Sequence, residues 1–343
     1  MRTFGRSFDI AALAEWDSQH PASAVRALFE HCALPGHETT SAQPLRVGAR
    51  NGYLNFYAKG QSVAKLSLAR EGPKLSVHSA YVSGRERNDL SGNPPEARTY
   101  VTFGPEALVG SSTVAQIGSW IATALTYTSA EKRFVDDLVA ANPGIIDLEM
   151  GLPAIDAPGS PRVAPRMDIA IVQTDSRRCS IAFWEAKCAN NSELRSGSDY
   201  AESSDGSFTG PKVINQVRKY IGWMAHDGHI EDVATAYRAT GELLLQFYQL
   251  FWSPSHASAP DCVGIWQALV ETEKPMVIVD PGLVIGNYWP EGYTEEVASG
   301  RMAQAARSFS TNGHRQKLEK HNINVFEVTD IGTRLPQLPL VSA

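Results

Sequence analysis

The pattern of apolar and polar residues divides the chain into a helical start, a run of strands and a longer mixed region. Apolar side chains recur with helical spacing over residues 7–32, and Pro21 separates two short predicted helices. From Leu45 to Val82 apolar and polar residues alternate, and Gly-containing turns such as Asn51-Gly52 interrupt the alternation. The pattern therefore predicts two helices followed by an antiparallel meander.

A polar stretch from Arg85 to Arg98 indicates a loop, and we place the domain boundary close to it. Residues 1–110 are then an α+β module with a recognition or regulatory role, and residues 111–343 form a second domain. In the second domain the spacing predicts one or two helices over 115–141 and a strand over 145–151. It also predicts a helix over 211–223, a helix over 231–252, and strands at 276–279 and 323–328.

The stretch from Arg166 to Lys187 predicts a β-hairpin, because two alternating segments flank a polar turn. A turn centred between Ser176 and Arg177 places Asp168 opposite Glu185. Side chains on a strand repeat with period two, so Glu185 and Lys187 share one face. Two carboxylates and an ammonium group therefore converge at one end of an apolar ribbon.

Opposed carboxylates repel each other unless a proton or a cation lies between them. Oxygen ligands without a neighbouring His or Cys suit Mg²⁺ or Mn²⁺ better than zinc. The simpler explanation is a Glu185–Lys187 ion pair on the surface, at the frayed end of the hairpin. The tripeptide alone is too common to decide between these interpretations.

Asp168 on one strand, followed by Glu185-Ala186-Lys187 at the end of the next, resembles the signature of the PD-(D/E)XK nuclease superfamily. Met167 stands where that family usually has a proline. The resemblance covers roughly residues 129–223. It implies an α/β fold with a restriction-endonuclease-like core, made of a helix, a three-stranded meander, a helix and a strand, next to the N-terminal α+β module.

Two further segments fit the same resemblance. Glu131 lies on the apolar stripe of a predicted helix, where a carboxylate needs a partner. It matches the helix glutamate that contributes to the family's metal site, although a capping box with Thr128 as N-cap is the competing explanation. Gln216-x-x-x-Tyr220 lies on one face of the later helix and is similar to the motif of the RecB-like branch, which includes many exonucleases.

The resemblance implies a Mg²⁺-dependent nuclease that hydrolyses phosphodiester bonds in DNA. It would prefer ends or single strands and would serve in defence or repair. Asp168, Glu185 and the carbonyl of Ala186 would hold Mg²⁺ or Mn²⁺, with Glu131 reaching it directly or through water. Lys187 would position the attacking water, and Gln216 and Tyr220 would brace the site. The alternative is a non-catalytic nucleic-acid-binding or sensor protein that retains the fold.

Composition changes the picture of how DNA would be bound. The net charge is −6, so DNA contacts must come from local basic patches and a metal. The best basic patch lies between Arg301 and His321, and we expect Arg315 and Lys317 to contact phosphates. A solvated helix face is the other explanation of this segment. The Ser- and Gly-rich segment 188–210 beside the site would be a flap over substrate or a plain loop.

Composition and motif content also indicate the compartment and the classes of function to expect. The four cysteines have no CxxC spacing, which indicates free thiols and a reducing cytoplasm. The longest uncharged stretch, residues 107–130, is rich in Ser, Thr and Gly, so we expect a buried helix and no membrane partner. Phosphate-binding glycine loops, the GxSxG elbow and the HExxH motif are absent. The oligomeric state stays open, a homodimer included.

Overall fold

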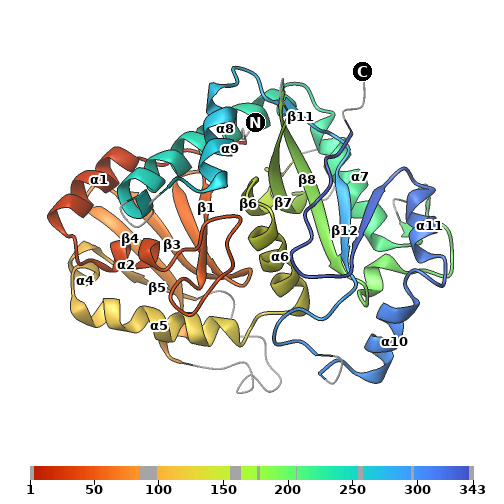
Figure 1. Ribbon diagram of the computed structural model, residues 1–343, viewed down its shortest axis with the longest axis horizontal. Coiled ribbons are helices and arrows are strands. Elements are labelled where there is room, and N and C mark those ends of the chain that lie inside the picture. Colours follow the sequence, from red (N-terminus) through yellow and green to blue (C-terminus); the bar gives the residue numbers. More distant parts are fainter. Residues whose placement is uncertain are drawn as a thin grey trace.

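The computed structural model describes residues 4–84, 99–154, 164–175, 178–205, 207–253, 258–294 and 297–339. The predicted hairpin turn at Ser176–Arg177 and the polar loop 85–98 lie outside the described residues. The chain is a mixed α/β protein with two large sheets that lie side by side (Figure 1).

The first sheet has five antiparallel strands in chain order, β1 to β5. Short turns with glycine join the first four strands, so the predicted meander is confirmed. Pro21 lies between the first two helices, as predicted. The elements are α1 (Ile10–Gln19), α2 (Ala24–Glu30), β1 (Leu45–Arg50), β2 (Tyr53–Ala58), β3 (Gln61–Ala69), β4 (Gly72–His78), α3 (Ser79–Val82), β5 (Tyr100–Phe103), α4 (Pro105–Leu108) and α5 (Ser111–Leu125).

The second sheet follows the order β13-β12-β8-β7-β6, with β11 also paired to β8. Its meander β6-β7-β8 is antiparallel, whereas β12 runs parallel to β8. The elements of this half are α6 (Ala130–Ala141), β6 (Ile145–Gly151), β7 (Arg166–Thr174), β8 (Cys179–Cys188), η2 (Ser192–Leu194), β9 (Ala201–Glu202), β10 (Phe208–Thr209), α7 (Lys212–Met224), α8 (His229–Phe247), η3 (Tyr248–Trp252), α9 (Asp261–Glu271), β11 (Met276–Val277), β12 (Gly282–Gly286), α10 (Gly300–Ser308), α11 (His314–Glu319) and β13 (Asn324–Val328).

Helices cover both faces of the second sheet. Along β8, Trp184 and Ala186 face the same apolar core as Phe134 of α6. Phe183 points the other way and packs against Tyr220 of α7, with ring centroids 5.3 Å apart. Because β8 also has strands on both edges, every one of its residues is buried. Charged side chains near its end must therefore be paired inside the protein.

The predicted hairpin register is confirmed. The pairs run from Thr174 opposite Cys179 to Ile169 opposite Trp184, and one further step places Asp168 across from Glu185. The predicted strand at 276–279 is shorter than expected, because only Met276–Val277 pair with β8. The sequence pattern missed β12, which is a brief apolar run between Gly282 and Gly286.

The two sheets share one core. The helix α5 begins just after residue 110 and packs on α2, α3 and β3 of the first sheet. The later helix α8 continues into the π-helical η3, which packs on α2, where Phe251 stacks on Phe29 with ring centroids 4.0 Å apart. The boundary at 110 stays a prediction, and the apolar core runs across it.

A buried ion cluster joins the sheets. Asp147 on β6 is 2% exposed, and Arg6 donates to its Oδ2 over 2.7 Å. Arg50 of β1 pairs with the other oxygen, and the Tyr237 hydroxyl donates to Oδ2 over 3.1 Å. Burial acts to raise the pKa of Asp147, but the two guanidinium groups outweigh it and hold the pKa below its usual value.

A second ion pair lies nearby, where Arg46 of β1 donates to Asp136 of α6 over 3.0 Å. Thr39 donates to the other Asp136 oxygen over 2.7 Å. Both pairs cross between the sheets, so they fix how β1 sits against α6 and β6.

We expect Asp147→Ala to lower the free energy of unfolding by about 3–5 kcal/mol, because it leaves two buried guanidinium groups without their partner. The measurement is urea unfolding at pH 7, with the exposed Asp227→Ala as the control. A lowered carboxyl pKa stabilises the fold above the unfolded pKa of about 3.9, and this contribution is lost as the pH falls through the folded pKa. The difference between wild type and variant should therefore shrink below about pH 4; a variant as stable as wild type at pH 7 would contradict this role.

Candidate active site

Asp168, Glu185 and Lys187 meet at the end of the β7–β8 hairpin, as the register predicts. The Ala186 N–H donates to Asp168 Oδ2 over 2.8 Å, which joins the two strands at this point. Lys187 Nζ donates to Glu185 Oε1 over 2.7 Å. Glu185 is 4% exposed and Lys187 is 5% exposed, so the alternative of a surface ion pair is wrong.

Glu131 joins this group from the first turn of α6. The helix begins after Ser129, whose side chain accepts from the Lys132 N–H, so the capping box with Thr128 as N-cap is wrong. Glu131 Oε1 lies 3.5 Å from Lys187 Nζ instead. Its other oxygen, Oε2, accepts a hydrogen bond of 2.8 Å from Asn191. A helix carboxylate and the end of β8 therefore belong to one cluster.

Two residues of the cluster, Asn191 and Glu193, were not expected from the sequence. Glu193 lies on the 3-10 helix η2 that follows β8, and its Oε2 is 3.8 Å from Lys187 Nζ. The available signal was their place a few residues after Lys187, but they stood among many polar residues of the segment 188–210. That segment is not a featureless loop, since it contains η2 and the short strands β9 and β10.

The strands also bring Glu149 of β6 close to the site. Its backbone has a φ of +53°, which is uncommon outside glycine, and its carboxylate lies 3.5 Å from Arg166. The negative charge of Glu149 acts on Asp168, in addition to that of Glu185. Glu149 had no distinguishing signal in the sequence, because it is one acid in an ordinary strand pattern.

Burial and the nearby Glu185 carboxylate raise the pKa of Asp168 well above its usual value. Burial also raises the pKa of Glu185, although Lys187 opposes the rise. For Lys187, burial acts to lower the pKa, but the carboxylates of Glu185, Asp168 and Glu131 outweigh it and raise the pKa above its usual value. Lys187 is thus a fixed cation and hydrogen-bond donor, and it is unsuited to act as a base.

Gln216 and Tyr220 lie on α7, which covers the face of the sheet that carries Phe183. Tyr220 is fully buried against Phe183, two residues before Glu185 on β8. Among the described residues, neither Gln216 Oε1 nor the Tyr220 hydroxyl has a hydrogen-bond partner, although both atoms are buried. Buried polar atoms are normally bonded, so these two are unusual. No hydrogen bond links either residue to the acids within the described chain.

Arg315 and Lys317 lie on α11, in the C-terminal part of the chain. Arg315 pairs with Glu319 at 2.8 Å. Lys317 donates to the backbone carbonyls of Ser196 and Ser198 over 2.9 and 3.1 Å. In the free protein these cations therefore make internal contacts, and their role toward phosphate stays a prediction.

The donors at the site fit a Mg²⁺ or Mn²⁺ ion in type. Within the described ranges, no three His, Cys, Asp or Glu side chains are grouped closely enough to enclose a metal. Mg²⁺ does not need such a cage, because it commonly uses one or two carboxylates and keeps several waters. Asp168 is held beside Glu185 with a raised pKa, an arrangement that a shared cation would relieve.

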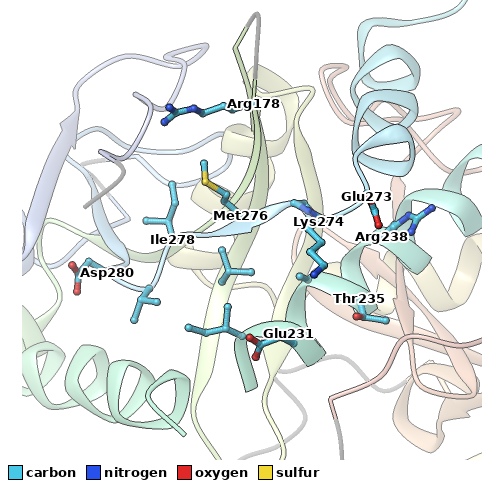
Figure 2. A pocket seen from close by; sticks show the side chains of 14 residues that line it. Arg178, Glu231, Thr235, Arg238, Glu273, Lys274, Met276, Ile278 and Asp280 are labelled. Carbon is cyan, nitrogen blue, oxygen red and sulfur yellow. The ribbon is translucent and has the colours of Figure 1, made fainter. Parts of the chain in front are cut away.

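A hollow lies elsewhere in the described part of the chain (Figure 2). It has a volume of about 800 Å³ and lies between α8 and the segment that begins with β11. Met276 and Ile278 come from that segment, and Glu231 and Thr235 come from the helix. Since β11 pairs with Ser180–Ile181, the hollow lies at the opposite end of β8 from Lys187.

Comparisons with protein-family models, with curated proteins and with solved structures gave no match. Within the described residues, no helix is both long and apolar enough to cross a bilayer. The four cysteines are buried and form no disulfide, in agreement with the prediction of free thiols.

We expect opposite stability changes from the two acids when no metal is present. Asp168→Asn keeps an oxygen to accept from the Ala186 N–H and removes a like charge, so the melting temperature should stay level or rise. Glu185→Ala removes the nearest partner of a buried ammonium, so the melting temperature should fall. The measurement is thermal unfolding in EDTA, with Asp227→Asn as the control. A fall of equal size in both variants would contradict this electrostatic account.

Proposed function

We propose that this protein is a Mg²⁺-dependent nuclease of the PD-(D/E)XK type that acts on DNA. The observation that carries the proposal is the meeting of Asp168, Glu185 and Lys187 at one buried end of the hairpin, with Glu131 beside them. The four ionisable groups come from α6, β7 and β8, and the two that are buried, Glu185 and Lys187, are costly to remove from water. Such a concentration is typical of a functional site.

The order of elements supports the finer fold assignment. A helix, a three-stranded antiparallel meander, a second helix and a strand occur as α6, β6-β7-β8, α7 and β12. This is the order that the resemblance implies for a restriction-endonuclease-like core. The two helices lie on opposite faces of the sheet, and the charged residues lie where β8 ends.

The residues have separate roles in this proposal. Asp168, Glu185 and the Ala186 carbonyl would hold the cation, with Glu131 reaching it directly or through water. When bound there, the cation would lower the pKa of a water ligand and offset charge that develops at phosphorus. Lys187, which stays protonated, orients the attacking water and adds positive charge. Gln216 and Tyr220 brace the α7 side or hold the scissile strand.

The net charge of −6 makes the DNA contacts local, so the cation and nearby basic residues must attract the phosphates. A second candidate function, a non-catalytic nucleic-acid sensor, is favoured by one observation. Glu185 is already neutralised by Lys187 at 2.7 Å, which is a stable arrangement without metal. Assays of metal binding and of DNA cleavage distinguish the two candidate functions.

We expect Asp168→Asn, Glu185→Gln and Lys187→Met each to lower the single-turnover rate of DNA cleavage on the order of 10²-fold or more. Groups that act in one transition state are non-additive, so a double variant should lose little more. The assay uses linear and covalently closed circular DNA with Mg²⁺ or EDTA, and exposed Lys274→Ala is the matched control. The resemblance of Gln216 and Tyr220 to the RecB-like motif predicts faster loss of the linear form.

Mn²⁺ should raise the melting temperature of wild type, because a ligand that binds only the native state stabilises it by mass action. It should not raise that of Asp168→Asn or Glu185→Gln. An identical Mn²⁺ response in wild type and Glu185→Gln would remove the metal site. That result would also overturn the nuclease proposal. If the wild-type protein still bound DNA, the non-catalytic sensor would be the favoured function.

The phosphate role of α11 has its own test. Arg315→Ala and Lys317→Ala should each weaken DNA binding. Each should also lower the slope of log affinity against log salt by about one unit, because one phosphate is no longer neutralised by the protein. The measurement is fluorescence anisotropy at several salt concentrations, again with Lys274→Ala as the control. Unchanged slopes would show that the cations of α11 make internal contacts only and do not contact phosphates.

A further inference from the structure

The segment that follows β8, residues 189–199, forms a strap across the site. Within it, a single amide side chain joins two parts of the chain. Asn191 Nδ2 donates to Glu131 Oε2 of α6 over 2.8 Å, and Asn191 Oδ1 accepts from the Glu193 N–H over 2.8 Å. Asn191 therefore ties the first turn of α6 to the start of η2.

The strap is itself held at several points. Leu194 is fully buried, and Arg195 donates to the carbonyls of Asn191 and Ala305, each over 2.6 Å. Ala305 lies on α10, so this arginine connects the strap to the C-terminal helices. Lys317 of α11 holds the far end through the Ser196 and Ser198 carbonyls. The strap is thus a fixed support for Asn191.

The two oxygens of Glu131 are used separately, Oε1 toward Lys187 and Oε2 toward Asn191. A glutamate side chain has many rotamers, and this one is 32% exposed on the first turn of a helix. Because Lys187 and Asn191 each hold one oxygen, the Glu131 carboxylate is restrained in its orientation. Without Asn191, the contact with Lys187 at 3.5 Å is a weak restraint.

We propose that Asn191 is a positioning residue that orients Glu131 toward Lys187 and the cation site, with the strap and the C-terminal helices as its support. Glu193, at 3.8 Å from Lys187, adds a further negative charge that keeps the ammonium in place. This proposal rests on the proposed nuclease function. It adds Asn191 to that function, a residue that lies outside the motif from which the function was inferred.

Asn191→Asp separates positioning from a merely structural role. Aspartate keeps the oxygen that accepts from the Glu193 N–H, so the turn stays capped. It removes the donor to Glu131 and places a like charge there. A residue that only caps the turn would tolerate this change, whereas a residue that orients Glu131 would not. The control is Asn287→Ala, which removes a matched Asn–Glu contact, to Glu327, outside the site.

The main readout is Mn²⁺ affinity, measured from free Mn²⁺ by electron paramagnetic resonance, with kcat and KM for DNA cleavage beside it. Loss of a hydrogen bond that orients a metal ligand typically costs 10- to 100-fold in metal affinity or activity. We expect losses of that size for Asn191→Ala and Asn191→Asp, with kcat affected more than KM. Asn287→Ala should bind Mn²⁺ like wild type.

A reciprocal exchange tests the contact without any need for activity. In the double variant Asn191→Asp with Glu131→Gln, the glutamine amide can donate to the aspartate, and its oxygen still faces Lys187. The melting temperature lowered by Asn191→Asp should recover in this double variant, while Mn²⁺ affinity should not.

The outcomes are distinct. Wild-type Mn²⁺ affinity in Asn191→Asp, or no recovery of melting in the double variant, overturns the positioning role and leaves the nuclease function standing. Wild-type protein that neither binds Mn²⁺ nor cleaves DNA overturns the nuclease function, and the positioning role along with it.

Discussion

Burial of a lysine ammonium in the central strand governs the arrangement of the site. Since β8 has strands on both edges and helices on both faces, Lys187 is only 5% exposed. A buried charge must be paired. Glu185, Glu131 and Glu193 supply the pairing at 2.7, 3.5 and 3.8 Å, and they come from β8, α6 and η2. The pairing of Lys187 therefore links these three elements at the site.

The same rule governs the junction between the sheets. Arg6 and Arg50 share Asp147, and Arg46 pairs with Asp136, with both acids buried. Asp136 lies on α6, the helix that also carries Glu131. The first sheet therefore helps to fix the helix from which Glu131 reaches the site. This gives residues 1–110 a structural link to the candidate chemistry.

The acidic site bears on how a chain with a net negative charge could bind DNA, as the proposed function requires. Asp168 and Glu185 are held together with raised pKa values, and Lys187 remains a cation. In the proposed function, this arrangement would bind a divalent cation, and the cation would in turn attract phosphate. Arg315 is engaged with Glu319 of its own helix, and Lys317 is engaged with the strap.

Local features follow from the order of residues alone: two helices around Pro21, the meander, and the hairpin register that opposes Asp168 to Glu185. These depend on period-two or helical alternation between residues close in the chain. Strand β12 was not predicted, because a short apolar run between glycines has no alternation that indicates a strand. Which distant groups meet at Lys187 depends instead on how the whole chain packs. Asn191 and Glu193 stood among many polar residues, and it is the tertiary placement of η2, which packs on α7, that brings them to Glu131 and Lys187.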